Sequence, residues 1–164
     1  MKIWFPIQIR FRDLDPLSHV NNTVYATYYE EARSAYFAHI PHWPLAGEHA
    51  TEPPEKEEEH TARIQTTVVG RHYGILIKEI TCIYHLPLIR TDRVEVGSAV
   101  VHVGRTSIVM EHQIRDIQNH ERIFSAGRAV AVWCNYRTGR PVPVPASLRA
   151  AFEEIEGHGF PLET

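Results

Sequence analysis

Residues 12–25 read RDLDPLSHVNNTVY, and the hydrophobic periodicity of the chain changes on either side of them. Across residues 3–12, apolar and polar side chains alternate, which predicts a β-strand. Pro6 within that stretch indicates an edge strand or a bulge, because proline donates no hydrogen bond to a neighbouring strand. Residues 13–21 are rich in Asp, Pro, Ser and Asn, and they predict a turn.

A helix is expected after this turn, from about Asn22 to His39. Aromatic and apolar residues recur there at spacings of three and four, which places them on one face of a helix. Asn21 or Asn22 is suited to cap the first turn, and Pro41 stops the helix. Because the apolar stripe is broad, we expect this helix to be well buried.

The remainder of the chain predicts mainly β-structure. Residues 41–61 are polar, with a Pro-Pro pair and a run of Glu, and they predict a solvated loop or, as an alternative, a lid over a ligand. A short helix is expected at Ala146–Glu156. Strands are expected near residues 62–69, 73–85, 93–104, 106–117 and 121–135. One buried helix against consecutive strands predicts an α+β domain with an antiparallel sheet, and we treat residues 1–164 as a single domain.

Composition excludes several classes of protein. The net charge of -3 argues against nucleic-acid binding, and no apolar run is long enough to span a membrane. The N-terminus lacks the apolar core of a signal peptide, and two cysteines are too few for a disulfide framework, so the cytoplasm is the expected location. His39 and His42 are separated by Pro41 with no further ligand nearby, so neither a metal nor a cofactor is expected.

The stretch at residues 12–25 closely resembles the signature of the 4-hydroxybenzoyl-CoA thioesterase-like hot-dog family, in which Asp-x-Asp and His-Val-Asn-Asn precede an aromatic helix. The blocks that follow in order are also similar to that family: residues 29–33, residues 80–92, residues 103–107 and residues 138–145. Ser18 departs from the family pattern, which commonly has glycine at this position. The resemblance implies an antiparallel sheet wrapped around one long central helix.

The resemblance also implies an acyl-CoA, or acyl-carrier-protein, thioesterase in which Asp15 is the catalytic carboxylate. A carboxylate either attacks the thioester or activates water as a general base, and the sequence leaves both open. The backbone amide at Asn22 would stabilise the oxyanion, helped by the helix dipole. His19 is either a second base or a group that orders the loop. From its neighbours alone, Asp15 is equally an ordinary turn residue, because Asp-Pro is a common turn pair.

The resemblance further implies a coenzyme A substrate and a shared site in a homodimer or a dimer of dimers. Tyr25 and Tyr29 are the expected contacts of the acyl group. The predicted contacts of the phosphates are Arg105, Thr106, Ser107 and Arg140. Two other functions stay open at this point: a hydratase or dehydratase on the same fold, and an acyl-CoA-binding protein without catalysis.

Overall fold

The computed structural model describes residues 1–40 and 73–161. The elements in chain order are β1 (Ile3–Ile7), a short 3₁₀ helix η1 (Phe11–Asp13), α1 (Asn22–Phe37), β2 (Tyr73–Tyr84), β3 (Val94–Val103), β4 (Ser107–Asp116), β5 (Ile123–Asn135), β6 (Arg140–Pro141) and α2 (Ala146–Glu156). The predicted strand at 62–69 and the predicted loop at 41–61 lie outside the described residues.

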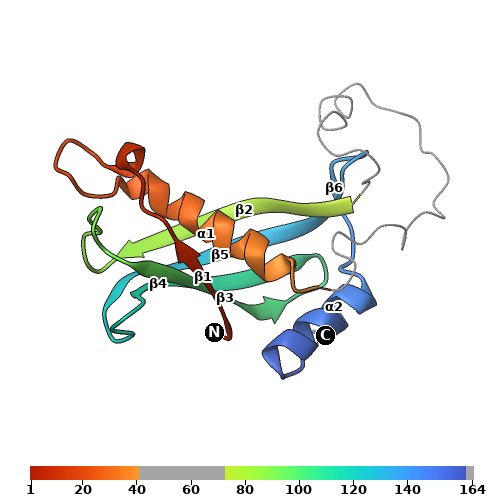
Figure 1. The fold of residues 1–164 in the computed structure, drawn as a ribbon. Helices are drawn as coiled ribbons and strands as arrows, with labels where there is room; N and C mark the ends of the chain where they lie inside the picture. Colours follow the sequence, from red (N-terminus) through yellow and green to blue (C-terminus); the bar gives the residue numbers. More distant parts are fainter. Residues whose placement is uncertain (41–72, 162–164) are drawn as a thin grey trace.

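The strands form one antiparallel sheet in the order β1-β3-β4-β5-β2, with the two-residue β6 beside β5. Helix α1 lies along one face of this sheet (Figure 1). The predicted α+β class and the hot-dog arrangement are therefore confirmed. Pro6 lies in β1, which is an edge strand, as the sequence predicted.

Two predicted boundaries were wrong. The first strand ends at Ile7 and not near residue 12, because the Asp13 carboxylate accepts a hydrogen bond from the Arg10 N–H at 2.7 Å and the chain turns into η1. Phe11, which continued the alternation, is 78% exposed as a result. Helix α1 ends at Phe37 and not at His39, because the N–H groups of His39 and Ile40 bond to the carbonyls three residues back, at 3.1 and 3.0 Å, which replaces the helical pattern with a tighter turn.

Helix α1 is fixed at its start by a side-chain cap and along its length by burial. The Asn21 carboxamide oxygen accepts the Thr23 N–H at 3.0 Å, which satisfies one of the unpaired amides of the first turn. The helix buries seven side chains: Tyr25, Tyr28, Tyr29, Ala32, Arg33, Tyr36 and Phe37. It also lies very close to the sheet, because a Cβ on Gly127 would lie 2.3 Å from the Tyr29 ring. Only glycine leaves room for the tyrosine there.

The two ends of the sheet carry different structures. The turn before α1, the segment between β2 and β3 and the β4–β5 hairpin gather at one end, whereas α2 and β6 lie at the other (Figure 1). At the α2 end, the Arg149 guanidinium donates to the carbonyls of Val103 and Gly104 at 2.9 and 2.8 Å. Strand β3 has ten residues, so the two ends are about 30 Å apart.

Candidate active site

Asp15 lies in a tight turn that is closed by its own backbone and side chain. Its N–H donates to the His19 carbonyl at 2.7 Å, and its carbonyl accepts the Ser18 N–H at 3.0 Å. Its Oδ1 accepts the N–H groups of Leu17 and His19 at 2.8 and 3.1 Å. No described residue donates to Oδ2. Oδ1 therefore holds the turn, while Oδ2 has no donor among the described residues.

Ser18 adopts a left-handed conformation in this turn, with φ at 64°. Glycine reaches that conformation without strain, whereas other residues do so at some cost. The glycine common at this position in the resembled family therefore has a geometric reason, and the serine keeps the same turn.

The turn is fixed directly in front of α1. Leu14 and Val20 form a β-bridge across its base, and the Asn21 N–H donates to the Asp13 carbonyl at 2.8 Å. The buried Asp13 carboxylate also accepts the Tyr28 hydroxyl at 2.9 Å. Burial and the neighbouring Asp13 raise the pKa of Tyr28 well above its usual value, so this hydroxyl remains a donor. Asp13 thus ties the turn to the helix.

Helix α1 presents an unpaired amide beside the turn. Asn22 is its first residue, and the Asn22 N–H donates no hydrogen bond within the described part of the chain. The Asn22 carbonyl accepts the Tyr84 hydroxyl at 3.0 Å, which ties this end of the helix to β2. An unpaired N–H at a helix start attracts negative charge, because the peptide dipoles of the helix add at that end.

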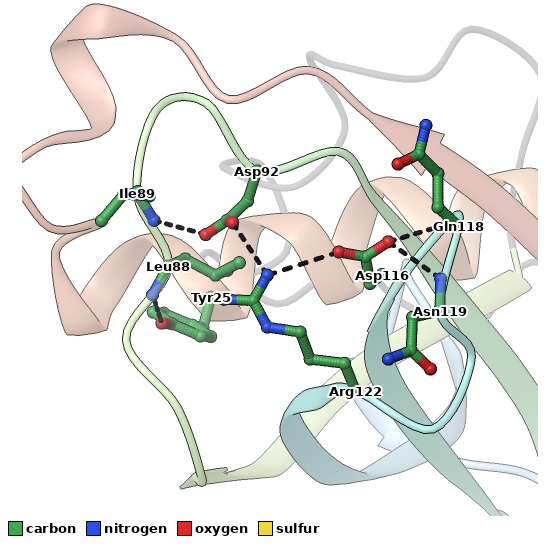
Figure 2. Close-up of polar contacts among 8 residues, drawn as sticks. All are labelled: Tyr25, Leu88, Ile89, Asp92, Asp116, Gln118, Asn119 and Arg122. Atoms are coloured by element: carbon green, nitrogen blue, oxygen red, sulfur yellow. Dashed lines mark hydrogen bonds and ion pairs between the residues drawn. The ribbon is translucent and has the colours of Figure 1, made fainter.

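The segment between β2 and β3 holds the turn from its other side. The Val20 N–H donates to the Leu88 carbonyl at 2.8 Å, and His19 forms a β-bridge with Ile89. The Leu88 N–H in turn donates to the Tyr25 hydroxyl at 3.3 Å (Figure 2). The backbone of His19 therefore orders the turn, while no described residue hydrogen-bonds its half-buried imidazole.

The two tyrosines that the resemblance assigns to the acyl group are both buried within the chain. Tyr25 is 2% exposed, and its ring packs edge-on against Tyr84 with centroids 4.9 Å apart. Tyr29 is fully buried, and its hydroxyl is hydrogen-bonded to the hydroxyl of Ser125. Both hydroxyls therefore already have protein partners, and contact of these rings with an acyl group stays a prediction.

The predicted phosphate contacts lie far from Asp15 in the same chain. Residues 105–107 form the β3–β4 connection and the start of β4, and Arg140 lies in β6; both belong to the α2 end of the sheet. Several exposed arginines lie instead on the segments at the Asp15 end: Arg12, Arg90, Arg93 and Arg122. The sequence could have predicted which arginines lie at each end of the sheet. Successive connections between antiparallel strands alternate between the two ends, so counting strands from the Asp15 turn assigns each connection to one end.

A polar cluster that the sequence did not predict lies between α1 and the sheet. His112 is 1% exposed, stacks on the Tyr29 ring at 5.0 Å and has its Nδ1 2.8 Å from the Ser98 hydroxyl. Burial, with the nearby Arg33 charge, lowers the pKa of His112 to about 3. One terminal nitrogen of Arg33 and Nε2 of His112 are buried and have no hydrogen-bond partner among residues 1–40 and 73–161. This cluster therefore holds a neutral imidazole at ordinary pH.

The geometry of the Asp15 end suits acyl transfer. Acyl transfer requires a nucleophile or a base and a donor for the oxyanion, and among the described residues Asp15 Oδ2 and the Asn22 N–H have no hydrogen-bond partner. Residues 9–152, which run from before η1 into α2, match the profile of one protein family. The chain belongs to the thioesterase-like superfamily.

Relatives in the thioesterase-like superfamily extend over most of the chain. A thioesterase from Thermus thermophilus, solved with coenzyme A and zinc, is 31% identical, has a TM-score of 0.70 and matches over 96% of each chain. A chloroplast acyl-acyl carrier protein thioesterase of Arabidopsis thaliana is 27% identical over 89% of this chain and 65% of its own length. This chain thus spans slightly less than two-thirds of that plant protein.

A more distant structure shows how widely this fold is shared. A 1,4-dihydroxy-2-naphthoyl-CoA thioesterase from Synechocystis has a TM-score of 0.69 at 10% identity, over 93% of this chain and 96% of its own. At that identity the likeness shows the fold alone.

Within residues 1–40 and 73–161, no three His, Cys, Asp or Glu side chains gather as a metal site. No helix of those residues is long and apolar enough to cross a membrane. Neither observation tests the cytoplasmic location, which stays a prediction.

Proposed function

We propose that this protein hydrolyses acyl thioesters, with Asp15 as the catalytic carboxylate and the Asn22 N–H as the oxyanion donor. The observation that carries the proposal is that, among the described residues, neither Asp15 Oδ2 in the anchored turn nor the N–H of Asn22 directly after that turn has a hydrogen-bond partner. Membership of the thioesterase-like superfamily supports the same reaction. The half-buried His19 imidazole is a further titratable group in the turn.

The reaction follows from these two groups. With Asp15 as general base, its Oδ2 takes a proton from water, the hydroxide oxygen bonds to the thioester carbon, and the carbonyl oxygen gains negative charge. The Asn22 N–H donates to that oxygen. The carbon–sulfur bond then breaks, the proton passes to the departing sulfur, and a free acid and a thiol result. With Asp15 as nucleophile, its Oδ2 bonds to the thioester carbon, the carbon–sulfur bond breaks and the thiolate leaves. Water then hydrolyses the acyl-aspartyl anhydride to the free acid and the Asp15 carboxylate, and the proton that is released passes to the thiolate.

The proposed substrate is an acyl group carried by coenzyme A or by an acyl carrier protein. The coenzyme A bound by the Thermus thioesterase supports the first carrier, and the carrier-protein thioesterase of Arabidopsis supports the second. We further propose a homodimer that pairs through β2. This edge strand exposes Leu76, Ile77, Ile80, Ile83 and Tyr84, each by at least 37%. A long apolar edge is unusual on a monomer.

The test is release of thiol from a panel of acyl-CoAs of different chain length, with Asp15→Asn as the main variant. The amide oxygen of asparagine can still accept the N–H groups of Leu17 and His19, so the turn should persist while the base or nucleophile is lost. We expect a loss of about 10²-fold or more in kcat with an unchanged melting temperature. An Asp15→Asn protein that keeps wild-type turnover would contradict the assignment. Hydration of an enoyl-CoA without thiol release would point instead to a hydratase.

A further inference from the structure

A carboxylate–arginine–carboxylate group lies next to the segment that holds the Asp15 turn (Figure 2). One terminal nitrogen of Arg122 lies 3.3 Å from Asp92 Oδ1 and 3.4 Å from Asp116 Oδ2. The Asp92 and Asp116 side chains are only 8% and 15% exposed, and the guanidinium lies over the Phe124 ring at 4.6 Å. The group joins the β4–β5 hairpin to the connection between β2 and β3.

Each carboxylate also holds the backbone of its own segment. Asp92 Oδ2 accepts the Ile89 N–H at 2.9 Å, and the Asp92 N–H donates to the Ile89 carbonyl at 3.1 Å, which closes a turn. Asp116 Oδ1 accepts the N–H groups of Gln118 and Asn119 at 2.7 and 3.1 Å. These backbone donors are the main reason that the pKa of Asp116 lies below its usual value, so the group is ionised opposite Arg122.

The closed turn at Ile89 is also the partner of the Asp15 turn. Ile89 forms the β-bridge to His19, and its neighbour Leu88 accepts the Val20 N–H. A continuous series of contacts therefore runs from Arg122 through Asp92 and Ile89 to the backbone of His19, which donates to Asp15 Oδ1. Arg122 lies outside the Asp15 turn and hydrogen-bonds none of its residues.

We propose that Arg122 is a positioning residue for Asp15: it fixes the segment at residues 88–92 and thereby the orientation of the catalytic turn. The inference rests on the proposed function for its kinetic effect. Its structural effect, which is the order of the turn, can be measured whether or not the protein turns over a given substrate.

The first arm of the test is kinetic. Arg122→Ala should lower kcat by about two- to fivefold, because the pair is partly exposed and such pairs are of modest strength. KM should change less, since Arg122 binds Asp92 and Asp116 and is not a proposed substrate contact. Arg122→Lys should recover most of the activity, because one nitrogen of Arg122 reaches both carboxylates and an ammonium can replace it.

Arg115→Ala is the matched control. Arg115 pairs with Glu95 at 2.8 Å and lies over the Trp4 ring at 3.3 Å, so it is at least as well held as Arg122, but it forms no hydrogen bond or ion pair with the Asp15 turn or with residues 88–92. It should leave kcat unchanged. If Arg115→Ala lowers kcat as much as Arg122→Ala does, general loosening explains the effect and the positioning role is overturned.

The second arm is amide hydrogen exchange. In Arg122→Ala, exchange should accelerate at the N–H groups of Ile89, Val20 and Asp15 and stay unchanged at Gly104, whose N–H is bonded to the Ser107 carbonyl at the other end of the sheet. Unchanged exchange at Val20 and Asp15 overturns the inference. If the wild type hydrolyses no thioester while exchange responds as expected, the proposed function fails and the positioning role stands.

Discussion

The sequence of Asp15 and its neighbours fitted both a turn residue and a catalyst, and the two carboxylate oxygens differ in the same way. Asp15 Oδ1 accepts the N–H of the residue two positions on, which is the geometry of an ordinary Asx-turn, while Oδ2 accepts nothing from the described residues. The position of this turn before a capped helix could be predicted, because Asp-Pro and Asn-Asn are local signals. The contacts with Leu88 and Ile89 could not, because they depend on which strands become neighbours in the sheet.

Asn22 offers a direct test of the oxyanion site, because it is the first residue of α1. Proline is well accepted at the first helical position, and the extended conformation of Asn21 (ψ 137°) suits a residue before proline. Asn22→Pro therefore removes the one N–H assigned to the oxyanion while the helix persists. We expect kcat to fall by about 10²- to 10³-fold in the thiol-release assay.

The control for this variant is Asn22→Ala, which removes the side chain and keeps the N–H. It should retain most of the activity. If Asn22→Ala lowers kcat as much as Asn22→Pro does, the side chain of Asn22, and not its backbone N–H, is the group that the reaction needs. Circular dichroism of both variants establishes that α1 is intact.

At the scale of elements, the sequence predicted the aromatic stripe of α1 but did not predict whether it packs into the core or lines a ligand site. Spacings of three and four locate a buried helical face, but they do not distinguish a core from the wall of a ligand site. Tyr25 and Tyr29 pack into the core of the single chain, and Gly127 is the feature of the sheet that admits Tyr29. The predicted end of the first strand was wrong because the Asp13 side chain accepts the Arg10 N–H, which is then not available to a neighbouring strand.

The interface between α1 and the sheet should weaken in acid because of His112. Its pKa is about 3 in the folded chain and near 6.5 when unfolded, so between these pH values the unfolded chain binds a proton that the folded chain does not. The free energy of unfolding should therefore fall, as pH drops through this range, by up to about 1.4 kcal/mol per pH unit.

Denaturant unfolding of His112→Gln at several pH values measures this contribution. The variant should show a shallower loss of stability than the wild type as pH falls from about 6.5 to about 4. His85→Gln makes the same chemical change at an exposed position and should leave the wild-type slope intact. Equal slopes for the wild type and His112→Gln would refute the assignment.

At the scale of the whole molecule, the order of the elements and the fold followed from the sequence, whereas distances across the sheet did not. Arg105 and Arg140 were grouped with Asp15 by function, yet the full length of the strands separates them from it. If they contact the same coenzyme A, they must come from another subunit. The proposed dimer is therefore the feature on which those two predictions depend.

The apolar edge of β2 gives the dimer a specific test. The double variant Ile80→Lys with Ile83→Lys places two charges on that edge, and we expect a monomer by light scattering together with loss of thioesterase activity. Val101→Lys adds a charge at a residue that is 40% exposed on β3, away from β2, and should stay dimeric. A double variant that remains a dimer would show that another surface joins the subunits.

Only one oxygen of the Asp15 carboxylate holds the turn, and this has a practical consequence for identifying the natural acyl group. An Asp15→Asn protein should keep a well-formed turn and should not hydrolyse the thioester, so the substrate should stay bound to it. Purified from its own cells and denatured, such a protein should release the uncleaved thioester, and mass spectrometry would read the acyl chain and its carrier together. The residue proposed to perform the hydrolysis is thus also the residue whose substitution would identify the physiological substrate.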